Sequence, residues 1–281
     1  MGDRAQYWRH KLDPVAWAMD ELRQPLRDKG VERFYPWQEA VLRAPQGAQQ
    51  IFLIHRQGGK SMIAAIKCLH AAIFHTRGKG PILITSPTQR QSGLLFDTIK
   101  DLIRDLSDPP GMDEDNKLSC RLTNGARIIS LHGEERTVRG YSNVALLIED
   151  EASRVKDELF MATEPMLIRS GGGRILMSTP YGKSGHFFRE YMNVEADGSQ
   201  RPDDLNIWQK ITFTVEENPD MNTPEKLAFL ARAKAMMGRR GYAQEFLCEF
   251  VETEDALFSY EDIMAAMSGE VRPLFGPGEE L

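Results

Sequence analysis

A short stretch of the chain, residues 51–61, leads from an apolar run through a glycine-rich turn to a Lys-Ser pair. It reads Ile-Phe-Leu-Ile-His-Arg-Gln-Gly-Gly-Lys-Ser, and residues 62–69 continue it with a helical pattern. This order of strand, loop and helix is typical of a cradle for nucleotide phosphates, because loop N–H groups surround the phosphates and the helix dipole adds positive charge. The segment therefore predicts a nucleotide site, with the lysine on the phosphates and the serine hydroxyl on Mg²⁺. The residues assigned to it are Gln57, Gly58, Gly59, Lys60 and Ser61.

The loop departs from the full phosphate-loop pattern, which has a glycine at the position that Ile54 occupies here. It also carries Arg56 inside the turn. The segment therefore predicts a variant loop, and on its own it leaves open an ordinary strand-to-helix turn.

Composition narrows the class of protein. The net charge of −6 argues against a generally basic nucleic-acid binder, although a local basic patch can still contact phosphates. No run of eighteen apolar residues occurs, so we expect no membrane span. Cys68, Cys120 and Cys248 lie far apart and outside any C-x-x-C spacing, which argues against structural zinc and a disulfide framework. We expect a cytoplasmic protein with reduced thiols.

Short apolar runs alternate with helical patterns along the chain, which predicts an α/β fold with a mainly parallel sheet covered by helices. The expected strands are 50–55, 82–85, 127–131, 144–148, 175–178 and 211–215. The expected helices are 14–29, 37–43, 60–75, 90–106, 156–167, 186–192 and 224–237. Asn124-Gly125 predicts a hairpin turn, and residues 108–117 predict a polar loop.

A second motif places three acids at the end of the expected strand 144–148. Acids at the carboxyl edge of an α/β sheet stand where such sheets bind ligands. Together with the loop, they predict that Asp150 holds Mg²⁺ and that Glu151 polarises a water molecule, while Glu149 points away. Taken alone, the motif is also compatible with a solvated loop or helix cap.

A third motif, residues 175–182, delivers Ser178 and Thr179 at the end of another expected strand. In motor ATPases this position senses the terminal phosphate, whereas a plain strand-to-turn junction is the alternative for these residues.

Three such motifs in this order resemble the motor-type P-loop ATPases of the additional-strand (ASCE) type. The particular residues resemble a narrower family, the large terminase subunit, which is the DNA-packaging ATPase of tailed phages. The resemblance runs from about residue 35 to 262. It includes Pro36-Trp37-Gln38, Arg56-Gln-Gly-Gly-Lys-Ser61, Ser86-Pro-Thr-Gln-Arg-Gln-Ser92, Arg139-Gly140, Ile148-Glu-Asp-Glu-Ala152, Ser178-Thr-Pro-Tyr-Gly182, Gln244-Glu-Phe-Leu-Cys-Glu-Phe250 and Ala256-Leu-Phe-Ser259.

The resemblance implies a domain plan. An ATPase core would occupy 1–215, with a helical extension over 1–34. A small C-terminal helical lid and linker would occupy 216–265, and a tail 266–281. Lid residues Lys234, Arg239 and Arg240 would contact DNA phosphates or form a charged surface.

The resemblance also implies residue roles. Gln38 would contact adenine, with Tyr35 or Trp37 packing nearby, unless Trp37 is a core residue. Arg56 would reach the γ-phosphate or, alternatively, form a structural salt bridge. Arg139, or else Arg136, would act in trans on the nucleotide of a neighbouring subunit, unless these arginines form a solvated face or a DNA contact.

The implied function is ATP hydrolysis, with ATP and Mg²⁺, that drives double-stranded DNA into a phage procapsid. The implied partners are the DNA, a portal protein, a small terminase subunit and further copies in a homo-oligomeric ring, in the cytoplasm of a host cell and with no membrane. Because the resemblance covers no ribonuclease-H-like domain, we expect no nuclease activity from this chain. The alternatives are a helicase-like or remodelling DNA-dependent ATPase and a non-hydrolysing terminase-like docking module.

Overall fold

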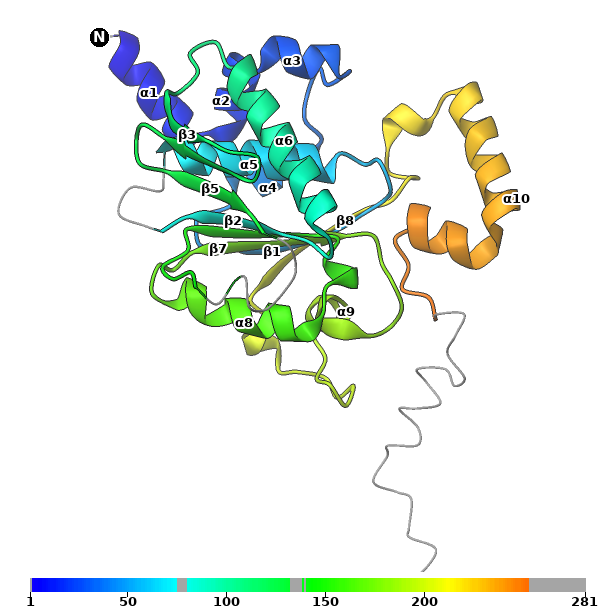
Figure 1. Cartoon of the computed structure of the whole chain (residues 1–281). Coiled ribbons are helices and arrows are strands. Elements are labelled where there is room, and N and C mark those ends of the chain that lie inside the picture. The colour runs from blue at the N-terminus through cyan, green and yellow to red at the C-terminus, as the bar shows by residue number, and fades with distance from the viewer. Residues whose placement is uncertain (1, 75–79, 132–137, 139, 253–281) are drawn as a thin grey trace, which may run out of the picture.

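The computed structural model describes residues 2–74, 80–131, 138 and 140–252, and in these residues one mixed sheet of eight strands forms the centre of the molecule (Figure 1). The strand order is β3-β4-β5-β2-β6-β7-β1-β8. The strands from β5 to β8 in this order pair in parallel, and the β3–β4–β5 edge is antiparallel. Their bounds are β1 Gln49–Ile54, β2 Ile82–Thr85, β3 Met112–Asp115, β4 Ser119–Leu122, β5 Arg127–Ser130, β6 Leu146–Asp150, β7 Gly173–Ser178 and β8 Trp208–Phe213.

Helices lie on both sides of the sheet (Figure 1). On one side are α1 Gly2–Leu12, α2 Pro14–Glu21, α3 Arg23–Asp28, α4 Pro36–Arg43, α5 Lys60–Phe74 and α6 Gln89–Asp105. On the other are α8 Asp157–Ile168 and α9 Gly185–Met192. The short 3₁₀ turns are η1 Ala152–Arg154, η2 Asp203–Leu205 and η3 Pro219–Met221, and α10 Pro224–Phe246 stands beside the sheet rather than over it.

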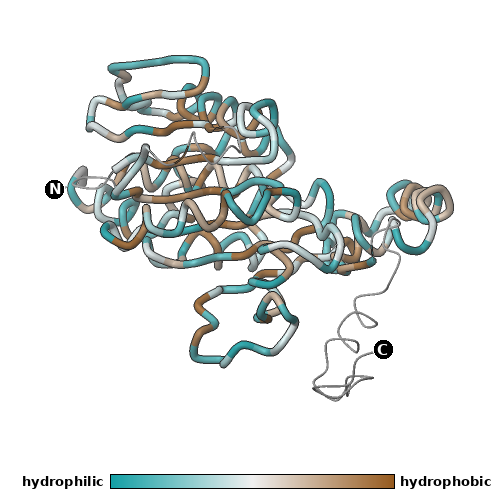
Figure 2. The backbone as a smooth tube through the Cα atoms, turned by 60° about the horizontal axis from the view of Figure 1, so that its bottom comes forward, coloured by the Kyte–Doolittle hydropathy of each residue, from teal (hydrophilic) through white to brown (hydrophobic). Residues whose placement is uncertain are grey.

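The central strands are largely apolar because both of their faces are covered. In β1, Phe52 and Ile54 pack into the core beneath α5 and α6, whereas Ile51 and Leu53 pack into the core beside α9. Successive side chains of a strand point to opposite faces. In a strand between two helical layers, therefore, neither set of alternate side chains faces solvent. Figure 2 shows the hydrophobic residues concentrated in the interior segments. The predicted α/β fold with a mainly parallel sheet is confirmed.

Three details of the predicted elements were wrong. Residues 108–117 were expected to be a loop, but they contain β3, whose four residues are all exposed and therefore carry no burial pattern. The helix expected at 14–29 is divided between α2 and α3 at Leu22. The helix expected at 224–237 extends to Phe246, with Gly238 in a non-helical conformation (φ 69°) at a kink. The predicted hairpin is present, with Gly125 at φ +87° between β4 and β5.

The α10 segment has its own small apolar cluster, formed by Val215, Leu230, Tyr242 and Phe246. The expected boundary at 215/216 falls at the edge of this cluster, and the division into core and lid stays a prediction. The end of the expected linker, 253–265, and the expected tail, 266–281, lie outside the described residues.

Candidate nucleotide site

The backbone of the loop that joins β1 to α5 is tight and requires its two glycines. Gln57 and Gly59 have positive φ angles of 63° and 91°. A Cβ added to Gly58 would come within 2.6 Å of the Ile54 Cγ2 atom, and one added to Gly59 within 3.2 Å of the Gln38 amide nitrogen. Glycine meets both demands, since it tolerates positive φ and close approach. The loop therefore presents backbone at the N-terminus of α5, where anions are favoured.

Lys60 and Glu151 form an ion pair at the mouth of this loop. The Lys60 Nζ atom donates to the Glu151 Oε1 atom at 2.8 Å, and both side chains are largely buried. Lys60 comes from the first turn of α5 and Glu151 from the end of β6. The fold thus brings together the two charged residues that the first two motifs predicted.

Glu151 is held in a strained conformation. Its φ of 53° is in the left-handed region, which is uncommon for a residue with a side chain and is found often at functional sites. The Ser178 hydroxyl donates to the Glu151 Oε2 atom at 3.2 Å and also contacts the Ser153 hydroxyl at 2.7 Å. Because β7 lies between β1 and β6, its last residue, Ser178, stands between the loop and the acidic strand. This inserted strand is the feature of the additional-strand fold.

Asp150 and Ser61 present oxygen atoms suited to a hard cation. Asp150 is buried, and one carboxylate oxygen accepts the Glu151 N–H at 3.0 Å. The other oxygen, like the Ser61 hydroxyl, has no hydrogen-bond partner among the described residues. Burial raises the pKa of Asp150 to about 6, against the attraction of Lys60. Oxygen donors of this kind fit Mg²⁺, which takes one or two protein ligands and completes its shell with phosphates and water. In the described part of the chain no group of three or more His, Cys, Asp or Glu side chains forms an all-protein metal cage.

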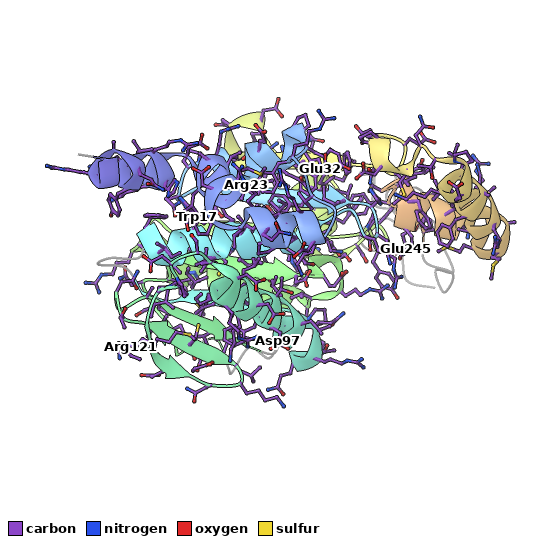
Figure 3. The ribbon with its side chains drawn as sticks, turned by 90° about the horizontal axis from the view of Figure 1, so that it is seen from above. Trp17, Arg23, Glu32, Asp97, Arg121 and Glu245 are labelled. Atoms are coloured by element: carbon purple, nitrogen blue, oxygen red, sulfur yellow. The ribbon has the colours of Figure 1, made fainter. Side chains whose placement is uncertain are left out.

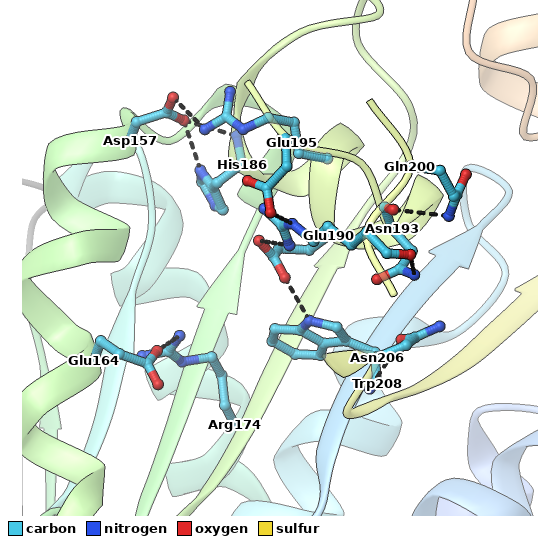
Figure 4. Close-up of polar contacts among 12 residues, drawn as sticks. Asp157, Glu164, Arg174, His186, Glu190, Asn193, Glu195, Gln200, Asn206 and Trp208 are labelled. Atoms are coloured by element: carbon cyan, nitrogen blue, oxygen red, sulfur yellow. Dashed lines mark hydrogen bonds and ion pairs between the residues drawn. The ribbon is translucent and has the colours of Figure 1, made fainter. Parts of the chain in front are cut away.

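Glu149 lies on the opposite face of β6, as the sequence predicted. It is fully buried, and its Oε1 atom bonds the His186 Nε2 atom at 2.6 Å. The His186 Nδ1 atom in turn faces Asp157 at 3.3 Å (Figure 4). A hydrogen bond from His186 keeps the pKa of Asp157 well below its usual range. This buried network packs against the face of β6 opposite the loop and does not contact the loop.

A pocket of about 240 Å³ opens between the loop, the end of β6 and the end of α10. It is lined by Arg56, Lys60, Gln91, Glu151, Arg154, Thr179 and Glu245. Four of these residues were predicted as site residues, whereas Gln91, Arg154 and Glu245 were missed in that role. Gln91 belongs to the 86–92 segment and Arg154 follows Glu151 by three residues, so proximity to a motif was the available signal. A larger cavity, about 630 Å³, lies along α8 and lacks such convergent charges.

Arg56 is joined to the end of α10. Its guanidinium lies 3.6 Å from the Glu245 carboxylate, and its backbone N–H donates to the Glu245 carbonyl oxygen at 2.9 Å. Figure 3 shows Glu245, near the end of α10, on the side of this helix that faces the body of the molecule. The salt bridge that the sequence left open as an alternative is therefore present, while the guanidinium itself remains mostly exposed.

The residues expected to surround adenine stand beside the loop. Gln38 is buried, and its side-chain oxygen accepts the Tyr35 N–H at 2.9 Å, which caps α4. The Tyr35 hydroxyl donates to the Asn218 side chain at 3.1 Å, and the Asn218 amide faces the His55 ring at 3.2 Å. Trp37 packs in the core against Phe213, with ring centroids 5.6 Å apart. This arrangement connects Gln38 and Tyr35 to the loop and leaves Trp37 in a packing role.

The remaining predicted cations divide into three cases. Arg136 and Arg139 lie outside the described residues. The Lys234 ammonium lies over the Tyr242 ring, 5.4 Å from its centroid, so it has a partner within α10. Arg239 and Arg240 are exposed just beyond the kink in α10. In the described residues no helix is long and apolar enough to cross a membrane.

Comparisons with known proteins identify the family of this chain and structures with a similar fold. A family model described as terminase large subunit, T4likevirus-type, N-terminal, matches residues 51–265. No curated protein matches the sequence.

Several solved structures are similar in fold. A mutant of the large terminase ATPase domain of Thermus Phage P74-26 is 17% identical, with a TM-score of 0.63, over 78% of this chain and 95% of that one. The large terminase of another thermophilic bacteriophage, in complex with ADP, is 14% identical, with a TM-score of 0.59, over 78% of this chain and 54% of that one. The large terminase of bacteriophage HK97 is 15% identical, with a TM-score of 0.60, over 78% and 51%. The aligned part thus spans about half the length of the last two proteins.

Proposed function

The chain belongs to the family of phage terminase large subunits, and from this premise we propose that it is an ATP-hydrolysing motor that drives double-stranded DNA into a procapsid. The observation that carries the proposal is the meeting of Lys60, Glu151 and Ser178 at the ends of three neighbouring parallel strands. Phosphoryl transfer needs mainly positioning and charge stabilisation, and these residues supply a cation, a carboxylate paired with it and a hydroxyl that bonds the same carboxylate.

The loop and the first turn of α5 would bind the phosphates. Backbone N–H groups of Gln57 and Gly59 would face the anion, Gly58 would allow the tight turn between them, and Lys60 would contribute a mobile charge. Ser61 and Asp150 would hold Mg²⁺, which supplies charge neutralisation at the phosphates when bound. The 240 Å³ pocket has room for terminal phosphates rather than for a whole nucleotide, so the base would lie outside it, toward Gln38 and Tyr35.

Glu151 would orient the attacking water and accept its proton. In the structure the Glu151 carboxylate is shared between Lys60 and Ser178. A γ-phosphate that attracts Lys60 would leave Glu151 bonded to Ser178 and able to accept a hydrogen bond from water. Water would then attack the γ-phosphorus in line, and ADP would leave.

Ser178 and Thr179 would report this change to the rest of the domain. Ser178 ends β7, which pairs with both β1 and β6 along most of its length. Arg56 offers a second route, because it joins the loop to Glu245 at the end of the lid helix. Movement of the lid against the core would then accompany exchange of the nucleotide.

The remaining parts of the proposal rest on family membership. They are stimulation by DNA, a homo-oligomeric ring, Arg139 acting in trans, and partnership with a portal protein and a small terminase subunit. Basic lid residues such as Arg239 and Arg240 are exposed and available to DNA phosphates.

Three substitutions test the catalytic assignment. Lys60→Ala should abolish binding of a fluorescent ATP analogue. Glu151→Gln should still bind the analogue. In single-turnover assays it should hydrolyse ATP at least about 10²-fold more slowly than the parent chain. Glu225→Gln, at an exposed position on α10, is the matched control and should behave like the parent. Near-parental hydrolysis by Glu151→Gln would refute the assignment of Glu151.

A further inference from the structure

Arg154 lines the pocket beside the loop although none of the three motifs includes it. It is the last residue of η1, the single 3₁₀ turn that follows Glu151. The Arg154 N–H donates to the Glu151 carbonyl oxygen at 2.9 Å, so the backbone fixes the distance between these residues. The Arg154 side chain lines the same 240 Å³ pocket as Lys60 and Glu151.

The three cations that line this pocket differ in their partners. Lys60 is paired with Glu151, and Arg56 is paired with Glu245. Arg154 has no carboxylate within ion-pair distance among the described residues. It therefore brings to the pocket a positive charge that no described acid neutralises.

The Arg154 guanidinium is held in place by an aromatic ring. It lies over the Tyr181 ring, 3.9 Å from the centroid, which is well within the range of a cation–π contact. Stacking uses the flat face of the guanidinium and leaves its N–H groups free to donate in the plane. Tyr181 follows Ser178 and Thr179, so the ring that holds Arg154 comes from the segment that touches Glu151 through Ser178.

We propose that Arg154 binds the γ-phosphate of a nucleoside triphosphate in its own subunit, and that Tyr181 positions its guanidinium for this contact. The inference rests on the proposed function and deepens it. A planar, weakly hydrated guanidinium is suited to bind phosphate oxygens, and an unpaired one requires no salt bridge to break. Because Tyr181 is joined to the end of β7, loss of the γ-phosphate on hydrolysis would alter the packing of that segment directly.

The contact would be specific to the triphosphate. Arg154→Gln should weaken binding of ATP by about 10-fold or more, as for loss of one charge-assisted contact, and should leave ADP affinity within about twofold. It should slow single-turnover hydrolysis by about 10²-fold. Tyr181→Phe keeps the ring and should behave like the parent, whereas Tyr181→Leu removes it and should reproduce part of the Arg154→Gln defect.

Arg169→Gln is the matched control, since it removes an exposed arginine outside the pocket. Competition against a fluorescent nucleotide gives both affinities, and phosphate release gives the rate. Equal behaviour of Arg154→Gln and Arg169→Gln, or equal losses for ATP and ADP, would overturn the inference.

Two further results separate the possible failures. If the parent hydrolyses ATP and Lys60→Ala does not, an unaffected Arg154→Gln overturns this inference alone. If the parent chain binds no ATP, both the proposed function and the inference on Arg154 fail. Mixing Arg154→Gln with Glu151→Gln should restore no activity, because both residues would act on the same nucleotide. Recovery on mixing would show that Arg154 acts in trans and would overturn the assignment to its own subunit.

Discussion

Replacing His186 with leucine should lower the free energy of unfolding by about 3–5 kcal/mol, because it leaves a buried carboxylate unpaired. Glu149 is fully buried, and His186, 2.6 Å away, is its hydrogen-bond partner among the described residues. The second Glu149 oxygen already has no partner, so no other described group can compensate. For a domain of this size the loss corresponds to a fall in melting temperature of about 6–20 °C.

The same pair gives the parent chain a pH dependence. Burial by itself lowers the pKa of His186, but Glu149 and Asp157 outweigh it and raise the pKa to about 9, from 6.5. A histidine pKa that is higher in the folded chain contributes stability fully below pH 6.5, and this contribution is lost as the pH rises through 9. The loss attributable to His186 over that window is at most about 3 kcal/mol.

Urea denaturation followed by tryptophan fluorescence at pH 6.5 and pH 9 measures both effects. The matched control is the double variant Glu149→Leu with His186→Leu, which removes both charges. It should be more stable than the sum of the single losses implies, since neither buried group is left unpaired. A loss below about 1 kcal/mol for His186→Leu, or strictly additive effects in the double variant, would refute the account of this pair.

Three further predictions concern the site and its support. Lys67 is buried, donates to two carbonyl oxygens at the end of α4, and burial lowers its pKa from 10.5 to about 8. Between pH 8 and 10.5 the unfolded chain holds more protons than the folded chain, so the contribution of Lys67 to the free energy of unfolding should rise with pH. Lys67→Met should abolish this rise in urea titrations, and an unchanged rise in the variant would contradict the prediction. Gly59→Ala should weaken ATP binding, measured by fluorescence titration, by about 10-fold or more through strain in the loop. Gly125→Ala is the control, because Gly125 has a similar φ of +87° in a distant hairpin. It should lower the free energy of unfolding about as much as Gly59→Ala does, yet leave the affinity for ATP unchanged. Glu245→Gln should change stability by less than about 1 kcal/mol, because the Arg56 side of the ion pair is mostly exposed and the pair is 3.6 Å apart. It should increase the preference for ATP over ADP, because Arg56 would be released toward the γ-phosphate; an unchanged ratio would confine Arg56 to its contact with α10.

The sequence predicted those parts of the fold that leave a local pattern. The strands β1, β2, β6 and β7 were found because burial on both faces makes them largely apolar. The exposed β3 escaped because pairing at a sheet edge needs no apolar residue. The kink at Gly238 was missed because a single glycine leaves a helical pattern largely intact.

The same distinction applies to the site. Lys60 and Glu151 were found because each lies in a motif of fixed spacing, and the fold joins them at 2.8 Å. Glu245 and Arg154 were not assigned to the pocket, since their roles arise from the return of the lid and from packing on Tyr181. Contacts of this kind depend on tertiary structure and produce no motif of fixed residue spacing in the sequence.

The most direct test of the central claim is steady-state ATP hydrolysis with Mg²⁺, measured with and without linear double-stranded DNA across a range of protein concentrations. A motor completed by an arginine of a neighbouring subunit should show turnover that rises more than linearly with protein concentration and increases with DNA. Glu151→Gln should lie at background throughout. Turnover that is absent under every DNA condition, or that persists in Glu151→Gln, would contradict the account.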